Sequence, residues 1–441
     1  MEEFGETDSD EDIENSYDEE DCDGYPAEVV VLKNGKKKKK VSSTNYGKIA
    51  TAIGKMKSAG ILIAPPAINE STYTFSPDVQ HNTIRYGLSG ITGLGDDKVK
   101  EIIANRPYSS INDCIARVKL KKPQVINLIK AGAFDEFDDR MELMKKYIGE
   151  ICGAKQRITL QNMQMMLSYN MIPDEFDLQR RTFNFNKYIK KFKTADGKYY
   201  LIDNIALGFL DRYFEIDNLM PDDNAESGFK ISIEKWDKIY KKQMDIIRPW
   251  VKANAARLLE ELNNNLMSDT WEKYCKGSIS KWEMDSVSCY FHDHELQKVE
   301  GFDDFELLPE TPEVERCLYI KNKQVPIFKL SRIAGTVLDR DKAKKLVTIL
   351  TKNGVVTVKI YGDVFTYYDK QISERGADGK KHVIEKSIFS RGNKIIVTGI
   401  KQEDSFLAKK YKSTPYHLVE LITKIDENGN IEVQKERAMV S

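Results

Sequence analysis

The stretch Arg85-Tyr-Gly-Leu-Ser-Gly-Ile-Thr-Gly-Leu-Gly-Asp-Asp-Lys-Val-Lys-Glu-Ile-Ile103 determines how the rest of the chain is interpreted. An apolar segment runs into a Gly93-Leu94-Gly95 turn. A helical pattern follows, in which Val99, Ile102 and Ile103 share one face. Two glycines around an apolar residue let the backbone turn sharply and leave N–H groups bare at a helix start.

Backbone N–H groups at a helix start favour an anion, because the orphan donors and the helix dipole both attract negative charge. Lys98 and Lys100 follow within reach of a bound phosphate. The pattern predicts a helix-hairpin-helix, which holds the sugar-phosphate backbone through Gly93, Leu94, Gly95, Lys98 and Lys100. Taken alone, a plain helical hairpin is the commoner explanation of such a turn.

Charge is distributed unevenly along the 441 residues, although the net charge is only −1. Residues 1–32 hold 14 Asp or Glu and no Lys or Arg. Residues 321–425 hold 22 Lys or Arg and 10 Asp or Glu, a net charge of +12. The basic region predicts a polyanionic partner, and the acidic start is too poor in aliphatic residues to form a core. Lys36–Lys40 fits either a nucleic-acid contact or a solvated turn.

Four further motifs, in the same order along the chain, resemble the alpha subunit of bacterial DNA polymerase III, the C family of replicative polymerases. They are Gly60–Ser71, Leu128–Asp135, Ser288–Leu296 and Phe328–Val337. Ala67 departs from the aspartate usual at its position in that family. The resemblance implies the end of the fingers, two hairpins and the start of an OB domain.

The resemblance also implies a catalytic palm whose carboxylates hold two metal ions, and these residues do not supply one. The nearest segment, Pro173–Leu178, spaces its Asp174 and Asp177 three apart, whereas carboxylates on one strand face need alternate positions. We therefore predict no catalytic residue, no metal site and no activity of this chain alone. Mg²⁺ is expected only in the missing catalytic part.

The C-terminal region predicts a five-stranded OB-type barrel, because three strands, a helix and two strands follow in that order. Asn353-Gly354 is a strong hairpin signal within it. The expected strands are 328–339, 345–352, 355–360, 394–400 and 418–425, with a helical span near 364–373.

OB barrels lay single strands across strands two and three by stacking and cations. The predicted contacts are Arg332, Lys345, Lys352, Lys359, Tyr361 and Phe365. A place in the barrel core is an equally good explanation for each of the two aromatic residues.

Residues 139–300 have mostly helical patterns. Within them, Phe183–Phe192 interleaves aromatics with lysines, which fits either a stacking platform or an amphipathic element with a basic solvent face. Cys289, His292 and His294 lack the spacing of a zinc finger, so a structural role is expected. Gln324, Ile327 and Phe328 loosely match a peptide that binds sliding clamps.

These patterns predict a multidomain α+β protein. The expected parts are an acidic segment (1–45), a fingers remnant (46–80), tandem hairpins (81–138), a mostly helical region (139–320), the OB domain (321–426) and a tail (427–441). No apolar run suits a membrane span and no signal peptide is present, so a cytoplasmic protein, in the host cytoplasm if phage-encoded, is expected.

Two functions remain open. The first is the DNA-binding part of a split replicative polymerase, whose partners are double- and single-stranded DNA, a separate catalytic chain and, if the loose peptide match is used, a sliding clamp. The second is a stand-alone, non-catalytic DNA-binding accessory protein.

Overall fold

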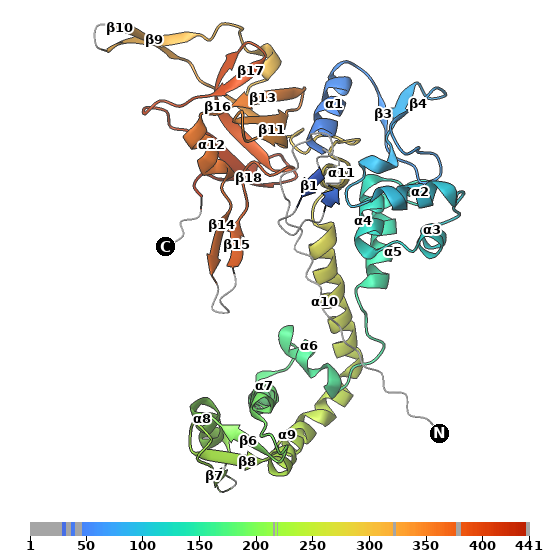
Figure 1. The fold of residues 1–441 in the computed structure, drawn as a ribbon, viewed down its shortest axis with the longest axis vertical. Coiled ribbons are helices and arrows are strands. Elements are labelled where there is room, and N and C mark those ends of the chain that lie inside the picture. The colour runs from blue at the N-terminus through green and yellow to red at the C-terminus, as the bar shows by residue number, and fades with distance from the viewer. Residues whose placement is uncertain are drawn as a thin grey trace. The chain divides into compact units, whose positions relative to one another are not determined.

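The computed structural model describes residues 29–31, 37–39, 46–214, 217, 219–320, 323–375 and 381–437 (Figure 1). The acidic segment 1–28 and the last four residues of the expected tail lie outside the described residues. The lysine run contributes β2 (Lys37–Lys39), which pairs with β1 (Val29–Val31).

The chain forms two compact units. The first joins Met1–Asp138 to Ser278–Ser441, and the second is Asp139–Gly277. The helical region was expected to extend to residue 320, but the residues from Ser278 onward belong to the first unit.

The hairpin region of the first unit holds three short helices. They are α2 (Asp96–Ala104), α3 (Ile111–Val118) and α4 (Lys122–Ala131), preceded by the 3-10 turn η1 (Leu88–Gly90). Ser110 caps α3 by accepting the Asp113 N–H, and α4 ends at Gly132, whose φ is 83°. The helical pattern read from the sequence is therefore confirmed.

A small sheet and the irregular segment 65–75, here called the strap, lead into the hairpins. Strands β3 (Ile63–Ala64) and β4 (Ser76–Asp78) flank β5 (Thr83–Arg85). The strap is tied down by backbone and side-chain bonds: Ile68 N–H donates to the Ala133 carbonyl at 2.7 Å, and Ser71 Oγ donates to the Tyr86 carbonyl at 2.8 Å.

Helix α11 (Ile279–Val287) returns the chain to the hairpins and packs against α4. The fully buried Tyr86 donates its hydroxyl to the Val287 carbonyl at 2.8 Å, and Thr92 N–H donates to the Ser286 carbonyl at 2.8 Å. Segments far apart in the sequence therefore form one hairpin core.

The C-terminal part of the first unit is a closed five-stranded barrel, as predicted. Its ring is β11 (Ser331–Asp341), β12 (Leu346–Leu350), β13 (Val355–Lys359), β17 (Ser405–Ala408) and β16 (Lys394–Gln402), closed by the pairing of β16 with β11. The β13–β17 pair is parallel and the others are antiparallel.

The fifth strand of this ring is the four-residue β17, which the sequence patterns did not predict. Strand β18 (Val419–Ile425) does form where a strand was expected, but it pairs with β16 and with β19 (Ile431–Gln434) outside the ring. A tight turn at Glu403, with φ of 51°, returns the chain at once into β17. With four residues, β17 is at the lower limit of the length over which a strand period shows.

Helix α12 (Gly362–Asp369) lies between β13 and β16 in sequence, as expected for this fold. Two ribbons leave the barrel: β9 (Val314–Ile320) with β10 (Lys323–Phe328), and β14 (Ile372–Arg375) with β15 (Lys381–Glu385) (Figure 1).

The second unit is mostly helical and adds a small sheet. Its helices are α5 (Arg140–Ile151), α6 (Met163–Ser168), α7 (Asp177–Ile189), α8 (Asn204–Tyr213), α9 (Ile233–Ala253) and α10 (Ala255–Cys275). Its strands are β6 (Tyr199–Ile202), β7 (Leu219–Pro221) and β8 (Phe229–Ser232).

Of the two explanations for Phe183–Phe192, the amphipathic one describes α7. Phe185 is buried and stacks on Phe209, with ring centroids 4.2 Å apart, while Lys187, Lys190 and Lys191 are exposed. The rings therefore serve the core of the second unit.

Candidate nucleic-acid interface

The first hairpin loop has the backbone geometry that its glycines predict. Gly93 has a φ of +76°, and a Cβ there would lie 3.1 Å from Asn127 Nδ2. Gly95 precedes α2 with an ordinary φ of −73° and open space where a side chain would go. Gly93 is thus needed for the turn, and Gly95 keeps the start of α2 accessible.

Side chains around this loop make it less cationic than the sequence suggests. Asp96 and Asp97 occupy the first turn of α2, and a hydrogen bond with Asp96 raises the pKa of the Tyr73 hydroxyl. Lys98 donates to the Val118 carbonyl at 2.7 Å and pairs with Glu101 at 2.8 Å. Lys98 therefore joins α2 to α3, and Lys100 is the exposed cation of this helix.

The loop between α3 and α4 is the more strongly basic one, and its residues were not among the predicted contacts. Lys119, Lys121 and Lys122 are all exposed, and none forms an ion pair with another described residue. Lys119 has a φ of 52°, and Gln124 Oε1 accepts the Lys121 N–H at 3.0 Å, which fixes the start of α4. The Lys119–Pro123 run was visible in the sequence, but only its exposure distinguishes it.

Three of the predicted barrel contacts gather at one end of the barrel. Lys359 lies opposite Leu346, the residue that follows Lys345, and Ile360 N–H donates to the Lys345 carbonyl at 3.1 Å. The next residue, Tyr361, is 64% exposed. Lys345, Lys359 and Tyr361 together form what we call the barrel-end patch.

Phe365 does not belong to this surface, so its prediction as a stacking residue is wrong. It is 1% exposed and packs in the barrel core against Phe389, with ring centroids 5.3 Å apart. Its position in α12 points it inward, which is the core alternative recognised for this residue. The ring cannot meet a base without repacking of the core.

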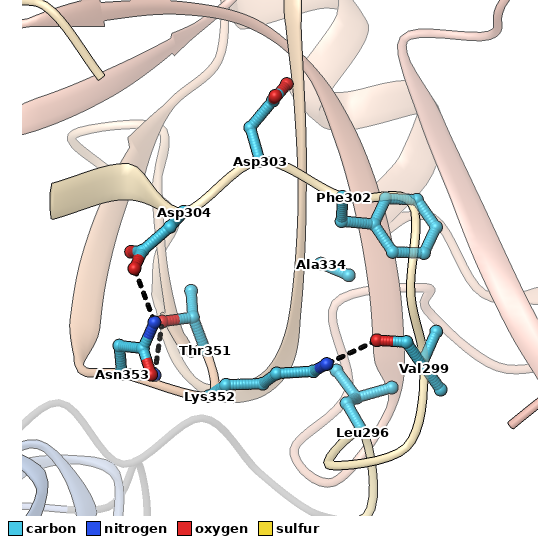
Figure 2. Close-up of a pocket in the computed structure, with 9 residues that line it drawn as sticks. All are labelled: Leu296, Val299, Phe302, Asp303, Asp304, Ala334, Thr351, Lys352 and Asn353. Carbon is cyan, nitrogen blue, oxygen red and sulfur yellow. Dashed lines mark hydrogen bonds between the residues drawn. The ribbon is translucent and has the colours of Figure 1, made fainter. Parts of the chain in front are cut away.

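Arg332 and Lys352 are engaged by the protein itself. Arg332 forms an ion pair with Glu420, whose side chain is 3% exposed. Lys352 donates its Nζ to the Val299 carbonyl across a cavity of about 100 Å³ (Figure 2). That cavity is lined by Leu296, Val299, Phe302, Asp303, Asp304, Ala334, Thr351, Lys352 and Asn353.

The outer face of strands β12 and β13, where a single strand was expected, is partly covered by α1 (Tyr46–Ser58). Helix α1 approaches so closely that a Cβ on Gly54 would lie 2.2 Å from Val355 Cγ2. Leu350 and Val355 pack into the cluster that includes Ala50 of this helix. The segment expected to be a fingers remnant therefore packs on the barrel.

The residues of the clamp-like peptide lie in β10, paired with β9. Ile327 is 8% exposed, and Phe328 N–H donates to the Tyr411 hydroxyl at 3.0 Å. Gln324 is exposed near the far end of the ribbon. Clamp binding stays a prediction, and two of its residues also anchor the ribbon base.

The Cys289–His294 segment has a structural environment. His292 Nδ1 lies 2.7 Å from Glu283 Oε1, and burial raises the pKa of the Cys289 thiol to about 12. Across the part of the chain that the structure describes, no group of three or more His, Cys, Asp or Glu side chains could hold a metal ion. Nor is any described helix long and apolar enough to cross a membrane.

Comparison with known proteins places these features in context. Residues 60–143 match the family described as a helix-hairpin-helix motif. The chain is 40% identical over 419 residues to a probable DNA polymerase, YorL, of Bacillus subtilis strain 168, and equally to a DNA-directed DNA polymerase of Bacillus phage SPbeta. These alignments cover 92% of this chain and 32% of each polymerase.

A shorter alignment reaches the alpha subunit of DNA polymerase III of Chlamydia trachomatis, with 33% identity over 117 residues, or 25% of this chain and 9% of that subunit. The chain thus spans about a third of the length of these two polymerases. The chain is therefore similar to DNA polymerases over most of its length and to the polymerase III alpha subunit over a quarter of it, and it combines a match to a helix-hairpin-helix motif with a closed five-stranded barrel.

Proposed function

We propose that the chain is the DNA-binding part of a replicative DNA polymerase. In this proposal the hairpins grip duplex DNA, the barrel binds the single-stranded template, and a separate chain supplies the catalytic carboxylates. The observation that carries the proposal is the 40% identity, over 92% of this chain, to a bacterial and a phage polymerase, of each of which it spans 32%.

The loop between α3 and α4 supports the duplex part of the proposal. Three exposed lysines there surround the start of α4, where the helix dipole also favours a phosphate. Such contacts position a protein on the duplex without reading its sequence. We assign this grip to Lys119, Lys121 and Lys122 first and to the Gly93–Gly95 turn with Lys100 second.

The barrel-end patch supports the single-strand part. It offers two lysines and the exposed Tyr361 on a domain whose net charge is +12. Cations that follow the backbone, beside a ring on which a base can stack, are the usual elements of single-strand binding. The patch replaces the partly covered β12–β13 face as the proposed site.

Exposed apolar residues near the strap support the proposed contact with a catalytic chain. Ile61 is 42% exposed, Leu62 is 64% exposed and Val79 is 86% exposed. Such residues lie in the segment that resembles the end of the fingers. Two-metal phosphoryl transfer needs carboxylates to hold Mg²⁺, and we propose that the partner chain contributes them.

Primer extension tests the proposal. The purified chain is expected to bind primed template and to incorporate no nucleotide with Mg²⁺. Adding a polymerase chain that carries the catalytic carboxylates, encoded beside this one, is expected to give extension that is more processive than that chain achieves alone.

Template-dependent extension by this chain alone, with host polymerase excluded, would show that the assignment to a separate catalytic chain is wrong. DNA binding without any effect on a neighbouring polymerase would instead favour the stand-alone accessory protein.

A further inference from the structure

The connection between β17 and β18 interleaves cations with aromatic rings. Its sequence, Lys409-Lys-Tyr-Lys-Ser-Thr-Pro-Tyr-His417, holds three lysines, two tyrosines and no acidic residue. None of these residues is among the predicted DNA contacts. Lysines beside exposed aromatic rings suit single-stranded nucleic acid, because every base has a face that can stack.

Hydrogen bonds hold this loop in one conformation at both ends. Lys409 N–H donates to the Thr398 carbonyl at 3.0 Å, and Thr398 Oγ1 donates to the His417 carbonyl at 2.8 Å. Within the loop, Thr414 N–H donates to the Tyr411 carbonyl at 3.0 Å and closes a turn. A preformed loop loses less conformational freedom when it binds a ligand.

The two tyrosines of the loop have different surroundings. Tyr411 is half-buried, and its hydroxyl accepts the Phe328 N–H, so it belongs to the ribbon base. Tyr416 is 45% exposed. Its ring centroid lies 4.1 Å from Cζ of Arg332, which is a cation–π stack.

Arg332 supports the Tyr416 ring and is itself held firmly. Its guanidinium pairs with the buried Glu420 and lies 5.4 Å from the Phe302 ring centroid. These contacts engage the guanidinium from within the protein, so we assign Arg332 a positioning role in place of the predicted direct phosphate contact. A ring held from behind in this way keeps one orientation.

Lys410 and Lys412 supply charge in the same loop as this ring. Both are exposed, and neither forms an ion pair with another described residue. Lys359 lies opposite Leu407 in the parallel β13–β17 pair. The two strands therefore deliver Tyr361 and Lys410 from neighbouring strand ends.

We propose that Tyr416 is a base-stacking platform for single-stranded DNA and that Lys410 and Lys412 contact the adjacent phosphates. The site extends the barrel-end patch and rests on the proposed function of the barrel. It takes any base, because stacking and backbone charge carry little sequence information.

Fluorescence anisotropy with labelled oligo(dT) and with a duplex of equal length tests the site on the full chain. Tyr416→Ala is expected to weaken oligo(dT) binding by roughly 5- to 150-fold, the range of base–aromatic stacking, and to leave duplex binding unchanged. Tyr416→Trp is expected to retain binding. The matched control is Tyr319→Ala, which removes a tyrosine that is 78% exposed on the β9–β10 ribbon.

The two lysines are tested by salt dependence. Lys410→Gln with Lys412→Gln is expected to reduce the slope of log K against log salt by roughly 0.7 for each phosphate of the single strand that is no longer neutralised. Lys241→Gln with Lys242→Gln, two exposed lysines of α9, is the charge-matched control. Arg332→Lys keeps the charge but loses the planar stack, so it is expected to weaken oligo(dT) binding and leave duplex binding unchanged.

Failure of the wild-type chain to bind oligo(dT) would overturn the single-strand part of the proposed function. A different outcome would overturn this site and leave the proposed function standing: the wild-type chain binds oligo(dT), Tyr416→Ala binds it equally well, and the lysine variant has the wild-type salt slope. If Tyr416→Ala does not fold, the salt slope of the lysine variant decides.

Discussion

Gly54 of α1 lies directly against Val355 of β13, so closely that an added Cβ would approach Val355 Cγ2 to 2.2 Å. Helix and barrel meet here without room for a methyl group. This contact joins the segment before the hairpins to the outer face of the barrel.

Gly54→Ala is therefore expected to destabilise the first unit, by about 1–3 kcal/mol, because overpacking a tight contact outweighs the helix propensity of alanine. Urea unfolding measures the loss. Gly208→Ala in α8 is the control, because a Cβ there meets nothing within 4 Å, and it is expected to be neutral or stabilising. Rescue of Gly54→Ala by Val355→Ala would confirm the contact, and equal effects of the two glycine substitutions would contradict it.

The two glycines of the first hairpin should respond differently to alanine. Gly93→Ala is expected to cost about 1–2 kcal/mol, because its φ of +76° is unfavourable for an L-residue. Gly95→Ala should change stability by less than about 0.5 kcal/mol, since its φ is ordinary and its surroundings are open. Thermal unfolding distinguishes them. A similar loss in both variants would show that the turn is not the one described.

Removing charge from each hairpin loop in turn should show which loop contributes more to duplex binding. Lys119→Gln, Lys121→Gln and Lys122→Gln together are expected to weaken duplex binding and to lower the salt slope by about 0.9 for each phosphate that these lysines neutralise. Lys98→Met should act mainly on stability, because Lys98 Nζ bonds the Val118 carbonyl. Duplex titrations at several salt concentrations test both. A larger loss of affinity in Lys98→Met would favour the first loop as the main grip.

His294 should make the first unit less stable in mild acid. Burial lowers its pKa to about 4, and its two ring nitrogens suit the neutral form: Nδ1 accepts the Leu296 N–H at 3.0 Å, and Nε2 lies 3.1 Å from the Leu350 carbonyl oxygen. Between pH 6.5 and 4 the unfolded chain binds the proton more readily. The free energy of unfolding should therefore decrease as the pH is lowered through this window, by at most about 3 kcal/mol.

Urea unfolding at pH 7 and pH 5 measures this dependence. In His294→Gln the part of the decline that comes from this ring should disappear, although the variant starts from a lower stability. An identical decline in wild type and variant would contradict the assignment.

Local signals predicted much of the fold. The Gly93-Leu94-Gly95 turn preceded a helix as expected, and Asn353-Gly354 closed the β12–β13 hairpin, where Thr351 N–H donates to the Gly354 carbonyl at 2.9 Å. Both depend on residues a few positions apart, which sequence patterns record directly.

Features set by distant packing were not predicted. Nothing local to α1 indicates that Gly54 meets Val355, and nothing in the strand pattern shows that α1 covers that face. The sequence left open whether Phe365 faces the core or the solvent, and the ion pair of Arg332 with Glu420 was not expected, because both depend on partners far along the chain. For the candidate site, residue types indicated the kind of chemistry, and exposure in the fold selected the residues.

The second unit interrupts the first between Asp138 and Ser278, yet α4 and α11 pack together across that interruption. During synthesis the ribosome must therefore release the whole of Asp139–Gly277 before α11 can pack against α4. A long unfolded loop between them would make that encounter slow, and early folding of the inserted unit would draw its two ends into a shorter effective loop. The order of translation thus makes the inserted unit a step in the maturation of the hairpins.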